Sequence, residues 1–407
     1  MAKKKEAKRK VTLKRGEEQP TTVSTELSNL RSEITKDRGE GKWHRANTLP
    51  HTRYIPTGIF LLDYALLGGF ADGRAGVIYG IEGSSKTTLL LLLISQFQKK
   101  NPEQGRIVDA QGEDQGGWPM AALADVEQMY DSAWAEQLGV DLDRLDVLEP
   151  THGEEATDMI IGYMGTIECG FVAIDSVASL TPSGMKERSA EDYGVGERAR
   201  IVGEFCSRAL SSWSDERRRD HSVTVMLINQ FRDKMNASKY ENPHKLPGGW
   251  QANYFPKIKL QMRQKKFYPA NSKIASYNDC TFRLTKEKGA TLMSGEFKVN
   301  LDPQHAFGLP VGAVDDYKTV ATYAKKLGWI TGGGKTWRIR DVDRIFGSLE
   351  AKNSIVAFLV DNPDEFIKLK QKIIIKKRVE LNMPPLPPDG YLLAPCDHET
   401  IEQALAE

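Results

Sequence analysis

Residues 76–88 read GVIYGIEGSSKTT, and this stretch decides the fold of the chain. The apolar run Val77–Tyr79 is typical of a buried strand, and it passes through a turn of small residues into a leucine-rich helix. A phosphate-binding loop needs this context, because backbone N–H groups at a helix N-terminus face a polyphosphate. We therefore predict a nucleotide site, with Lys86 on the β- and γ-phosphates and the Thr87 hydroxyl on Mg²⁺. The loop comprises Gly80, Ile81, Glu82, Gly83, Ser84, Ser85, Lys86, Thr87 and Thr88.

The loop departs from the usual pattern at one position. A glycine normally precedes the lysine, whereas this chain has Ser85 there and a glycine at Gly83. An ordinary Gly/Ser turn that happens to precede a lysine is the alternative interpretation. The preceding strand, the spacing and the Lys-Thr-Thr run together favour the nucleotide site.

Length and charge indicate a large globular protein. The 407 residues suffice for two or three domains, and 56 Lys and Arg residues nearly balance 55 Asp and Glu residues. The overall charge therefore indicates no polyanionic partner. Residues 1–15 are strongly basic, however, and the chain after Leu381 is acidic and lacks Lys and Arg. We expect both ends to be solvated tails; contact with nucleic acid and simple solubilisation both remain open for the basic one.

The cysteines argue against a metal or disulfide framework. Cys169, Cys206, Cys280 and Cys396 form no CxxC pair and lie near no histidine cluster, which fits a reducing compartment. The longest apolar run, Leu89–Ile94, is too short to span a bilayer, and no signal-peptide pattern follows the charged N-terminus. The expected location is the cytoplasm, with no membrane partner.

Apolar strands alternate with helices after Tyr54, which is typical of an α/β fold with a mostly parallel sheet. The expected strands are Val77–Tyr79, Arg106–Asp109, Phe171–Asp175 and Val223–Ile228, followed by a pair at Ile258–Met262 and Thr281–Lys288. A helix is expected before them at Thr22–Lys36, with Leu27, Leu30 and Ile34 on one stripe.

From about Gly308 onward the pattern indicates a small α+β domain. Apolar residues between Val314 and Leu327 recur at helical spacing, and Gly332–Gly334 predicts a hairpin turn. Helices are then expected at Asp341–Phe346, Ala351–Val360 and Pro363–Glu380, before a proline-rich end.

The strand Phe171–Asp175 ends in an acid. A carboxylate at the carboxyl end of a buried strand beside a phosphate-binding loop can orient Mg²⁺ through water. Many buried strands end in aspartate, but the order along the chain favours a metal-orienting role for Asp175.

Six segments in this order resemble the RecA-type recombinases over roughly Tyr54 to Glu380. They are IYGIEGSSKTT, VDAQG, WAEQLGVDLDRL, AIDSVASLTPS, LINQFRDKM with GGW following, and LTKEKG. The resemblance implies a RecA-like ATPase core, an N-terminal helix for polymerisation and a small C-terminal domain. It divides the chain into a basic disordered tail at 1–20, the polymerisation helix and linker at 21–53, the core at 54–307, the C-terminal domain at 308–382 and an acidic, Pro-rich tail at 383–407.

The resemblance also implies a function. RecA-type recombinases use ATP and Mg²⁺ to assemble a helical filament on single-stranded DNA and to pair that strand with a homologous duplex. This chain is expected to do the same in a bacterial cell or a phage-infected host, and its degenerate motifs suggest a phage member. Two alternatives remain open: a recombination mediator that binds ATP and DNA with little hydrolysis, and a ring-forming helicase-type motor.

Nucleotide contacts follow from matching positions. Asp131 and Trp134 fall where the family contacts adenine, and the Trp134 ring suits stacking on a base. Asn229 and Gln230 end a strand beside the expected γ-phosphate, where the Gln230 amide would sense whether that phosphate is present.

DNA contacts are expected from two loops. The resemblance makes Phe231–Gly249 the second DNA-binding loop and Thr181–Val195 the first; basic groups there would contact phosphates without reading sequence. The expected DNA-binding residues are Arg200, Arg232, Lys234, Lys239 and Lys245. Taken singly, each of these charges is also consistent with an ordinary solvated side chain.

Two lysines are expected to act on a neighbouring subunit. Lys286 and Lys288 are two apart on an expected strand, so both leave the same face. In the family such lysines reach the neighbour's ATP, as arginine fingers do elsewhere; an exposed strand face is the plain alternative. Tyr254 falls at an interface aromatic of the family.

The attacking water poses a problem. The family has a glutamate that positions it, whereas the matched segment VDAQGED places Gln111 there. A carboxamide can orient a water but cannot usefully accept its proton. Glu113 is a candidate substitute, and extra sequence follows from Gln115 to Met129. Gln111 and Ser85 together lead us to expect slow hydrolysis.

Overall fold

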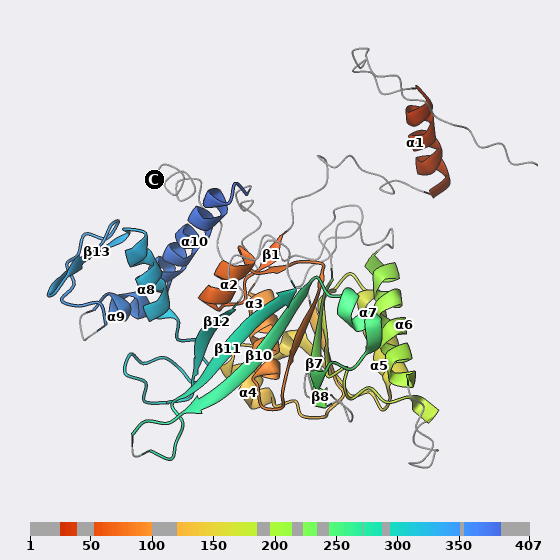
Figure 1. The fold of residues 1–407 in the computed structure, drawn as a ribbon, viewed down its shortest axis with the longest axis horizontal. Helices are drawn as coiled ribbons and strands as arrows, with labels where there is room; N and C mark the ends of the chain where they lie inside the picture. The colour runs from red at the N-terminus through yellow and green to blue at the C-terminus, as the bar shows by residue number, and fades with distance from the viewer. Residues whose placement is uncertain are drawn as a thin grey trace, which may run out of the picture. The chain divides into compact units, whose positions relative to one another are not determined.

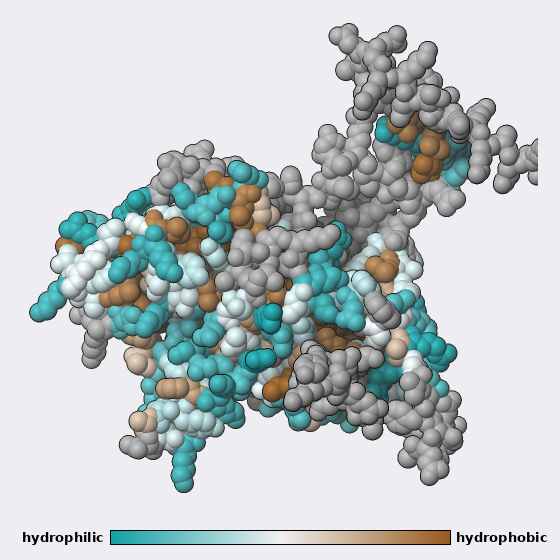
Figure 2. Space-filling view, viewed as in Figure 1, coloured by the Kyte–Doolittle hydropathy of each residue, from teal (hydrophilic) through white to brown (hydrophobic). Residues whose placement is uncertain are grey.

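In this computed structural model, residues 25–38, 53–99, 120–184, 196–213, 223–233, 244–270, 272–286, 294–350 and 354–383 are described. The chain forms two units, residues 1–50 and 51–407. The described part of the first is the helix α1 (Thr25–Arg38), which overlaps the expected helix. Leu27 and Leu30 on α1 are 42% and 50% exposed, and Figure 2 shows apolar residues gathered on this helix.

An eight-stranded sheet forms the centre of the second unit (Figure 1). Its order is β12 (Ser294–Asn300), β11 (Tyr277–Lys286), β10 (Ile258–Phe267), β3 (Ala75–Gly80), β7 (Thr224–Gln230), β6 (Cys169–Asp175), β4 (Met120–Asp125) and β5 (Leu145–Leu148). The strands from β10 to β5 are parallel, whereas β11 and β12 extend the sheet in antiparallel fashion. This arrangement confirms the mostly parallel α/β fold.

Helices cover the sheet so that its central strands are buried. Along β3, Ile78 packs into one apolar cluster while Val77 and Tyr79 pack into another, as alternation along a strand requires. The first cluster includes α3 (Lys86–Gln98) and residues of α2 (Phe60–Leu66) and α4 (Ser132–Gln137). The second includes residues of α5 (Gly153–Met164), α6 (Glu197–Trp213) and α7 (Gly249–Tyr254).

Short elements complete the core. They are β1 (Tyr54–Ile55) paired with β2 (Phe70–Ala71), a 3₁₀ turn at Leu142–Arg144, and β8 (Arg232–Asp233) paired with β9 (His244–Lys245). Within the described residues, no helix is long and apolar enough to cross a membrane.

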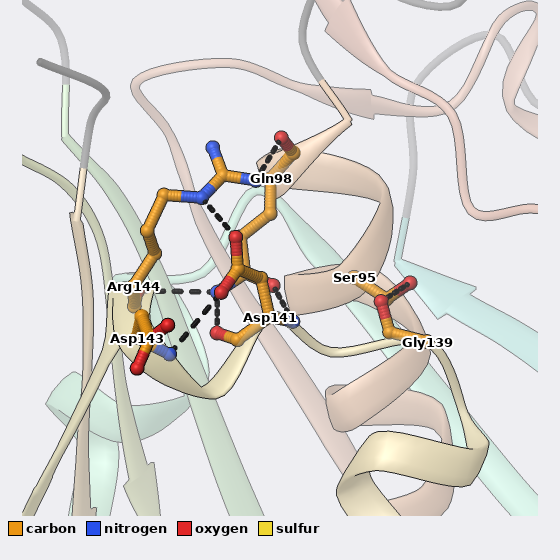
Figure 3. Close-up of polar contacts among 6 residues, drawn as sticks. All are labelled: Ser95, Gln98, Gly139, Asp141, Asp143 and Arg144. Atoms are coloured by element: carbon orange, nitrogen blue, oxygen red, sulfur yellow. Dashed lines mark hydrogen bonds and ion pairs between the residues drawn. The ribbon is translucent and has the colours of Figure 1, made fainter.

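The segment LGVDLDR is hydrogen-bonded to the C-terminal end of α3 (Figure 3). The Ser95 hydroxyl donates to the Gly139 carbonyl at 2.8 Å, and the Gln98 amide donates to the carbonyls of Asp141 and Arg144 at 2.9 and 3.1 Å. In return, the Asp141 N–H donates to the Gln98 side-chain oxygen at 2.9 Å, and the Arg144 guanidinium donates to the Gln98 carbonyl at 2.8 Å. These bonds fix the direction of the helix that begins at the phosphate-binding loop.

The C-terminal part packs as a third apolar cluster. It is built from α8 (Tyr317–Lys326), the hairpin β13 (Ile330–Gly333) and β14 (Thr336–Ile339), α9 (Ile355–Asp361) and α10 (Pro363–Glu380). The expected hairpin and the expected helix Pro363–Glu380 are confirmed. Phe60 of α2 lies in this cluster, and its N–H donates to the Asp316 carboxylate at 2.7 Å.

One expectation is wrong, and the pattern left some strands unpredicted. Asp341–Phe346 is not helical: Phe346 exchanges backbone hydrogen bonds of 2.9 and 2.8 Å with Trp337, because its buried ring anchors the segment beside β14. The strands β5 and β12 were not expected from the pattern. The expected strand Arg106–Asp109 lies outside the described residues, and the strand between β6 and β5 is β4.

Candidate nucleotide site

The phosphate-binding loop joins β3 to α3. Gly80 ends the strand at a point where a Cβ would stand 2.5 Å from the Met262 carbonyl oxygen and from the Ser84 hydroxyl, so only glycine fits without a shift. Gly83 and Ser85 both adopt left-handed conformations, with φ of 66° and 60°. Ile81, Glu82 and Gly83 are exposed, whereas Ser84 and Ser85 are buried.

Lys86 is 7% exposed and lies at the start of α3. Its Nζ donates to the Ile81 carbonyl at 2.7 Å, which holds the ammonium over the loop. Burial lowers the pKa of Lys86, while the nearby carboxylates of Asp175, Glu127 and Glu82 act in the opposite direction. A buried lysine beside the N-terminus of a helix is suited to bind the charge of a polyphosphate.

Thr87 and Asp175 meet directly. The Thr87 hydroxyl donates to a carboxylate oxygen of Asp175 at 2.6 Å, so the two residues expected to hold Mg²⁺ lie together. Burial raises the pKa of Asp175 to about 6, with the Thr87 hydrogen bond lowering it and the Glu127 charge raising it. A hydroxyl and a carboxylate are the oxygen ligands that Mg²⁺ prefers, so this pair fits the metal.

Glu127 is the residue that the sequence analysis missed. It follows β4 by two residues, and three donors reach its Oε1: the hydroxyls of Ser176 and Ser179 at 2.5 and 2.9 Å, and the Gln230 amide at 2.8 Å. Neighbouring Asp125 accepts the Tyr130 N–H at 2.8 Å. The Glu127 charge also acts on the pKa values of Lys86 and Asp175, so this carboxylate lies near both of them.

A signal for Glu127 was present in the sequence. The run ALADVEQ ends three residues before Asp131, so the apolar strand with a following acid stands directly ahead of the expected adenine contacts. The resemblance to the family placed the water-positioning residue in the segment VDAQGED instead. Gln111 and Glu113 lie outside the described residues.

Gln230 and Asn229 end β7 beside this group. The Asn229 oxygen accepts the Gln230 N–H at 2.9 Å, and its amide donates to the Pro247 carbonyl at 3.0 Å. The pair therefore links Glu127 on one side to the end of the segment 231–249 on the other.

Asp131 and Trp134 lie at α4. The Asp131 carboxylate caps the helix by accepting the Trp134 N–H at 3.1 Å. The Trp134 indole N–H donates to the Thr88 hydroxyl at 3.4 Å, and the ring packs against the first apolar cluster. The structure thus brings Trp134 to the helix that carries the loop.

The remaining candidates lie on other elements or are only partly described. Arg200 is exposed on α6, and Tyr254, at the end of α7, is 69% exposed. Lys286 ends β11, where its ammonium donates to the carbonyls of Asn253, Tyr254 and Pro256 at 3.2, 2.9 and 2.6 Å. The backbones of Arg232 and Lys245 pair in β8 and β9. Lys234, Lys239 and Lys288 lie outside the described residues.

Comparisons with known proteins agree with this geometry. The family model described as RecA N-terminal domain matches residues 26–300. Protein RecA of Francisella philomiragia is 36% identical over 242 residues, which are 58% of this chain and 61% of that protein, so the match spans about three fifths of that relative. Protein RecA of Mycoplasmopsis pulmonis is 27% identical over 80% of this chain and 86% of its own length. Protein RecA of Picosynechococcus sp. is 29% identical over 85% of this chain and 90% of its own length.

Proposed function

Because this chain belongs to the RecA family, we propose that it is an ATP-dependent DNA recombinase. In this proposal it assembles as a helical filament on single-stranded DNA, in the cytoplasm of a bacterial cell or a phage-infected host. It then pairs that strand with a homologous duplex and exchanges strands. The observation that carries the proposal is the meeting of Glu127 and Gln230 beside the Thr87–Asp175 pair, at 2.8 Å between the amide and the carboxylate.

ATP and Mg²⁺ are the proposed cofactors. The backbone of residues 80–88 would cradle the phosphates, Lys86 would bind the β- and γ-phosphate oxygens, and Trp134 would stack on the adenine. Thr87 and Asp175 would hold Mg²⁺, directly and through water. Bound Mg²⁺ would supply neutralisation of charge on the phosphates.

Glu127 is the proposed general base. Its Oε1 is held by Ser176, Ser179 and Gln230, so its other oxygen, Oε2, is the one proposed to orient a water and take its proton. This assignment replaces the expectation for Gln111 and Glu113. With Glu127 as the general base, Gln111 gives no reason to expect slow hydrolysis.

Gln230 is the proposed link between hydrolysis and DNA. Its amide is bonded to Glu127, and the segment that carries Arg232 and Lys245 begins one residue later. A γ-phosphate that competes for this amide would pull on the end of β7. The proposed DNA contacts of Arg200, Arg232, Lys234, Lys239 and Lys245 would then respond to the nucleotide.

Two measurements test the proposal. We expect steady-state ATP hydrolysis to rise when long single-stranded DNA is added, and electron microscopy with a non-hydrolysable ATP analogue to show open helical filaments. Glu127→Gln protein serves as the control, since it should form filaments without turnover. Filaments with no DNA-stimulated hydrolysis by the unaltered chain would indicate a mediator instead, and closed rings would indicate a motor.

A further inference from the structure

The phosphate-binding loop contains two left-handed positions of different kinds. Gly83, with φ of 66°, has no atom within 4 Å of the place where a Cβ would stand. Ser85, with φ of 60° and ψ of 31°, carries a Cβ in a conformation that costs a non-glycine residue free energy. Something must therefore hold Ser85 in this geometry, because its N–H and carbonyl form the junction between the loop and α3.

The Ser85 side chain does not cap the helix. A serine at an N-cap usually adopts an extended conformation and accepts an N–H from the first turn, but Ser85 is left-handed and makes no such bond. Its hydroxyl instead donates to the side-chain oxygen of Gln264 on β10. Ser85 is 9% exposed, so this contact lies largely away from water, where a hydrogen bond is stronger than at the surface.

The Gln264 side chain is itself held by a second hydrogen bond. Its amide donates to the Asn278 side-chain oxygen on β11 at 2.8 Å, and Asn278 is 8% exposed. Ser85, Gln264 and Asn278 form a polar chain that runs from the loop across two strands of the sheet. Each glutamine group has a partner, so Gln264 offers its oxygen to Ser85 in one defined position.

We propose that Gln264 is a positioning residue for the nucleotide site: it holds Ser85 in the left-handed conformation that a glycine before the lysine would adopt without help. The inference rests on the proposed ATP binding. It implies that Gln264 matters only because the chain has Ser85 in place of that glycine. Ser85 and Gln264 then make coupled contributions to nucleotide binding.

A double-mutant cycle tests this coupling on the full chain, with ATP affinity as the readout. Gln264→Met keeps the size of the side chain but removes its acceptor, and it should weaken ATP binding about tenfold. In the Ser85→Gly background, Gln264→Met should change the affinity by less than about twofold, because glycine needs no partner. Gln261→Met is the matched control: Gln261 lies on the same strand but on its other face, and its substitution should leave the affinity unchanged in both backgrounds.

The outcomes are distinguishable. An equal loss from Gln264→Met in both backgrounds would overturn the coupling, as would no loss in either. Restored binding in Ser85→Gly/Gln264→Met protein would show that the single variant had not simply unfolded. If the unaltered chain and Ser85→Gly protein both bind no ATP, the proposed function fails first; if both bind and the cycle is additive, only the role of Gln264 fails.

Discussion

The Thr87 hydroxyl donates to the Asp175 carboxylate at 2.6 Å, although 88 positions separate the two residues in the chain. Thr87 lies in the first turn of α3 and Asp175 at the carboxyl end of β6. In parallel α/β sheets, ligands bind at the carboxyl ends of the strands, and this contact marks that edge.

The first prediction concerns this pair. Thr87→Val keeps the shape of the side chain but removes the hydroxyl, so Mg²⁺-dependent ATP binding should weaken by at least about tenfold at limiting Mg²⁺. Thr87→Ser keeps the hydroxyl and should bind nearly normally. Isothermal titration over a series of Mg²⁺ concentrations measures both. Equal affinity of the Val and Ser variants would contradict a metal role for this hydroxyl.

The second prediction tests whether Glu127, and not Gln111 or Glu113, is the general base. Glu127→Gln should lower DNA-stimulated hydrolysis by ~10²–10⁴-fold while ATP still binds, because a general base is lost and the phosphate contacts remain. Gln111→Glu and Glu113→Gln should leave the rate within a few-fold. Steady-state hydrolysis with saturating DNA is the measurement. A sharp loss in Glu113→Gln with normal activity in Glu127→Gln would reverse the assignment.

The third prediction concerns Lys286 and Lys288. If they act on the ATP of a neighbouring subunit, Lys286→Ala/Lys288→Ala protein should still bind ATP through its own Lys86. Mixed with the unaltered chain at fixed total protein on long single-stranded DNA, it should lower hydrolysis by more than dilution, since each altered subunit disables an adjacent site. A linear decline, with co-assembly demonstrated, would return the two lysines to an exposed strand face.

The fourth prediction concerns α1. Removal of residues 1–40 should shorten filaments seen by electron microscopy but leave the fold of residues 53–383 intact, because α1 belongs to a separate unit. Leu27→Ala/Leu30→Ala is a milder variant, since these side chains are 42% and 50% exposed on α1. An unchanged circular dichroism melting curve is the control for folding. Normal filament lengths from the truncated chain would remove α1 from the assembly.

The fifth prediction is a pH dependence of stability at Asp63. Burial raises the pKa of Asp63 from 3.8 to about 7, with the Lys370 charge and the Thr57 hydrogen bonds acting in the opposite direction and the Asp316 charge adding to the rise. Between about pH 4 and pH 7 the folded chain then holds a proton that the unfolded chain has lost. The free energy of unfolding therefore falls as pH rises through this window.

Asp63→Asn should remove this dependence, because an amide oxygen can still accept the Thr57 N–H that now bonds to Asp63 at 2.7 Å. The free energy of unfolding of the variant, relative to the unaltered chain, should rise by up to roughly 4 kcal/mol from pH 4 to pH 8. Urea unfolding at several pH values measures it. Asp341→Asn, at a more exposed ion pair with Lys372, is the control; parallel curves for Asp63→Asn and the unaltered chain would contradict the prediction.

Much of the fold was predictable because its signals are local. The strand at Val77–Tyr79, the acid-ended strand at Phe171–Asp175 and the helix Pro363–Glu380 are confirmed within a few residues. Each has a strong pattern: a continuous apolar run for a strand buried on both faces, or a proline at the start of a long helix. β5 escaped prediction because LDVL is short and mixed in character.

Glu127 escaped prediction for a different reason. The strand before it, MAALAD, is rich in alanine and lacks β-branched residues, so it has little strand propensity of its own. This segment forms a strand because it is buried between β6 and β5, and that burial depends on the assembly of the whole sheet. Likewise, the contact of Ser85 with Gln264 joins positions 179 residues apart, and only the register of β10 beside β3 brings them together.

The hydrogen bond from the Phe60 N–H to Asp316, together with the burial of the Phe60 ring among residues of α8, α9 and α10, has a consequence for chimeras. Arg378 adds to it by donating to the Leu67 carbonyl at 2.7 Å. A graft of residues 308–382 from one relative onto another would replace only one side of this interface, because α2 forms the other side. A chimera should therefore exchange α2 and the C-terminal helices as one matched cassette.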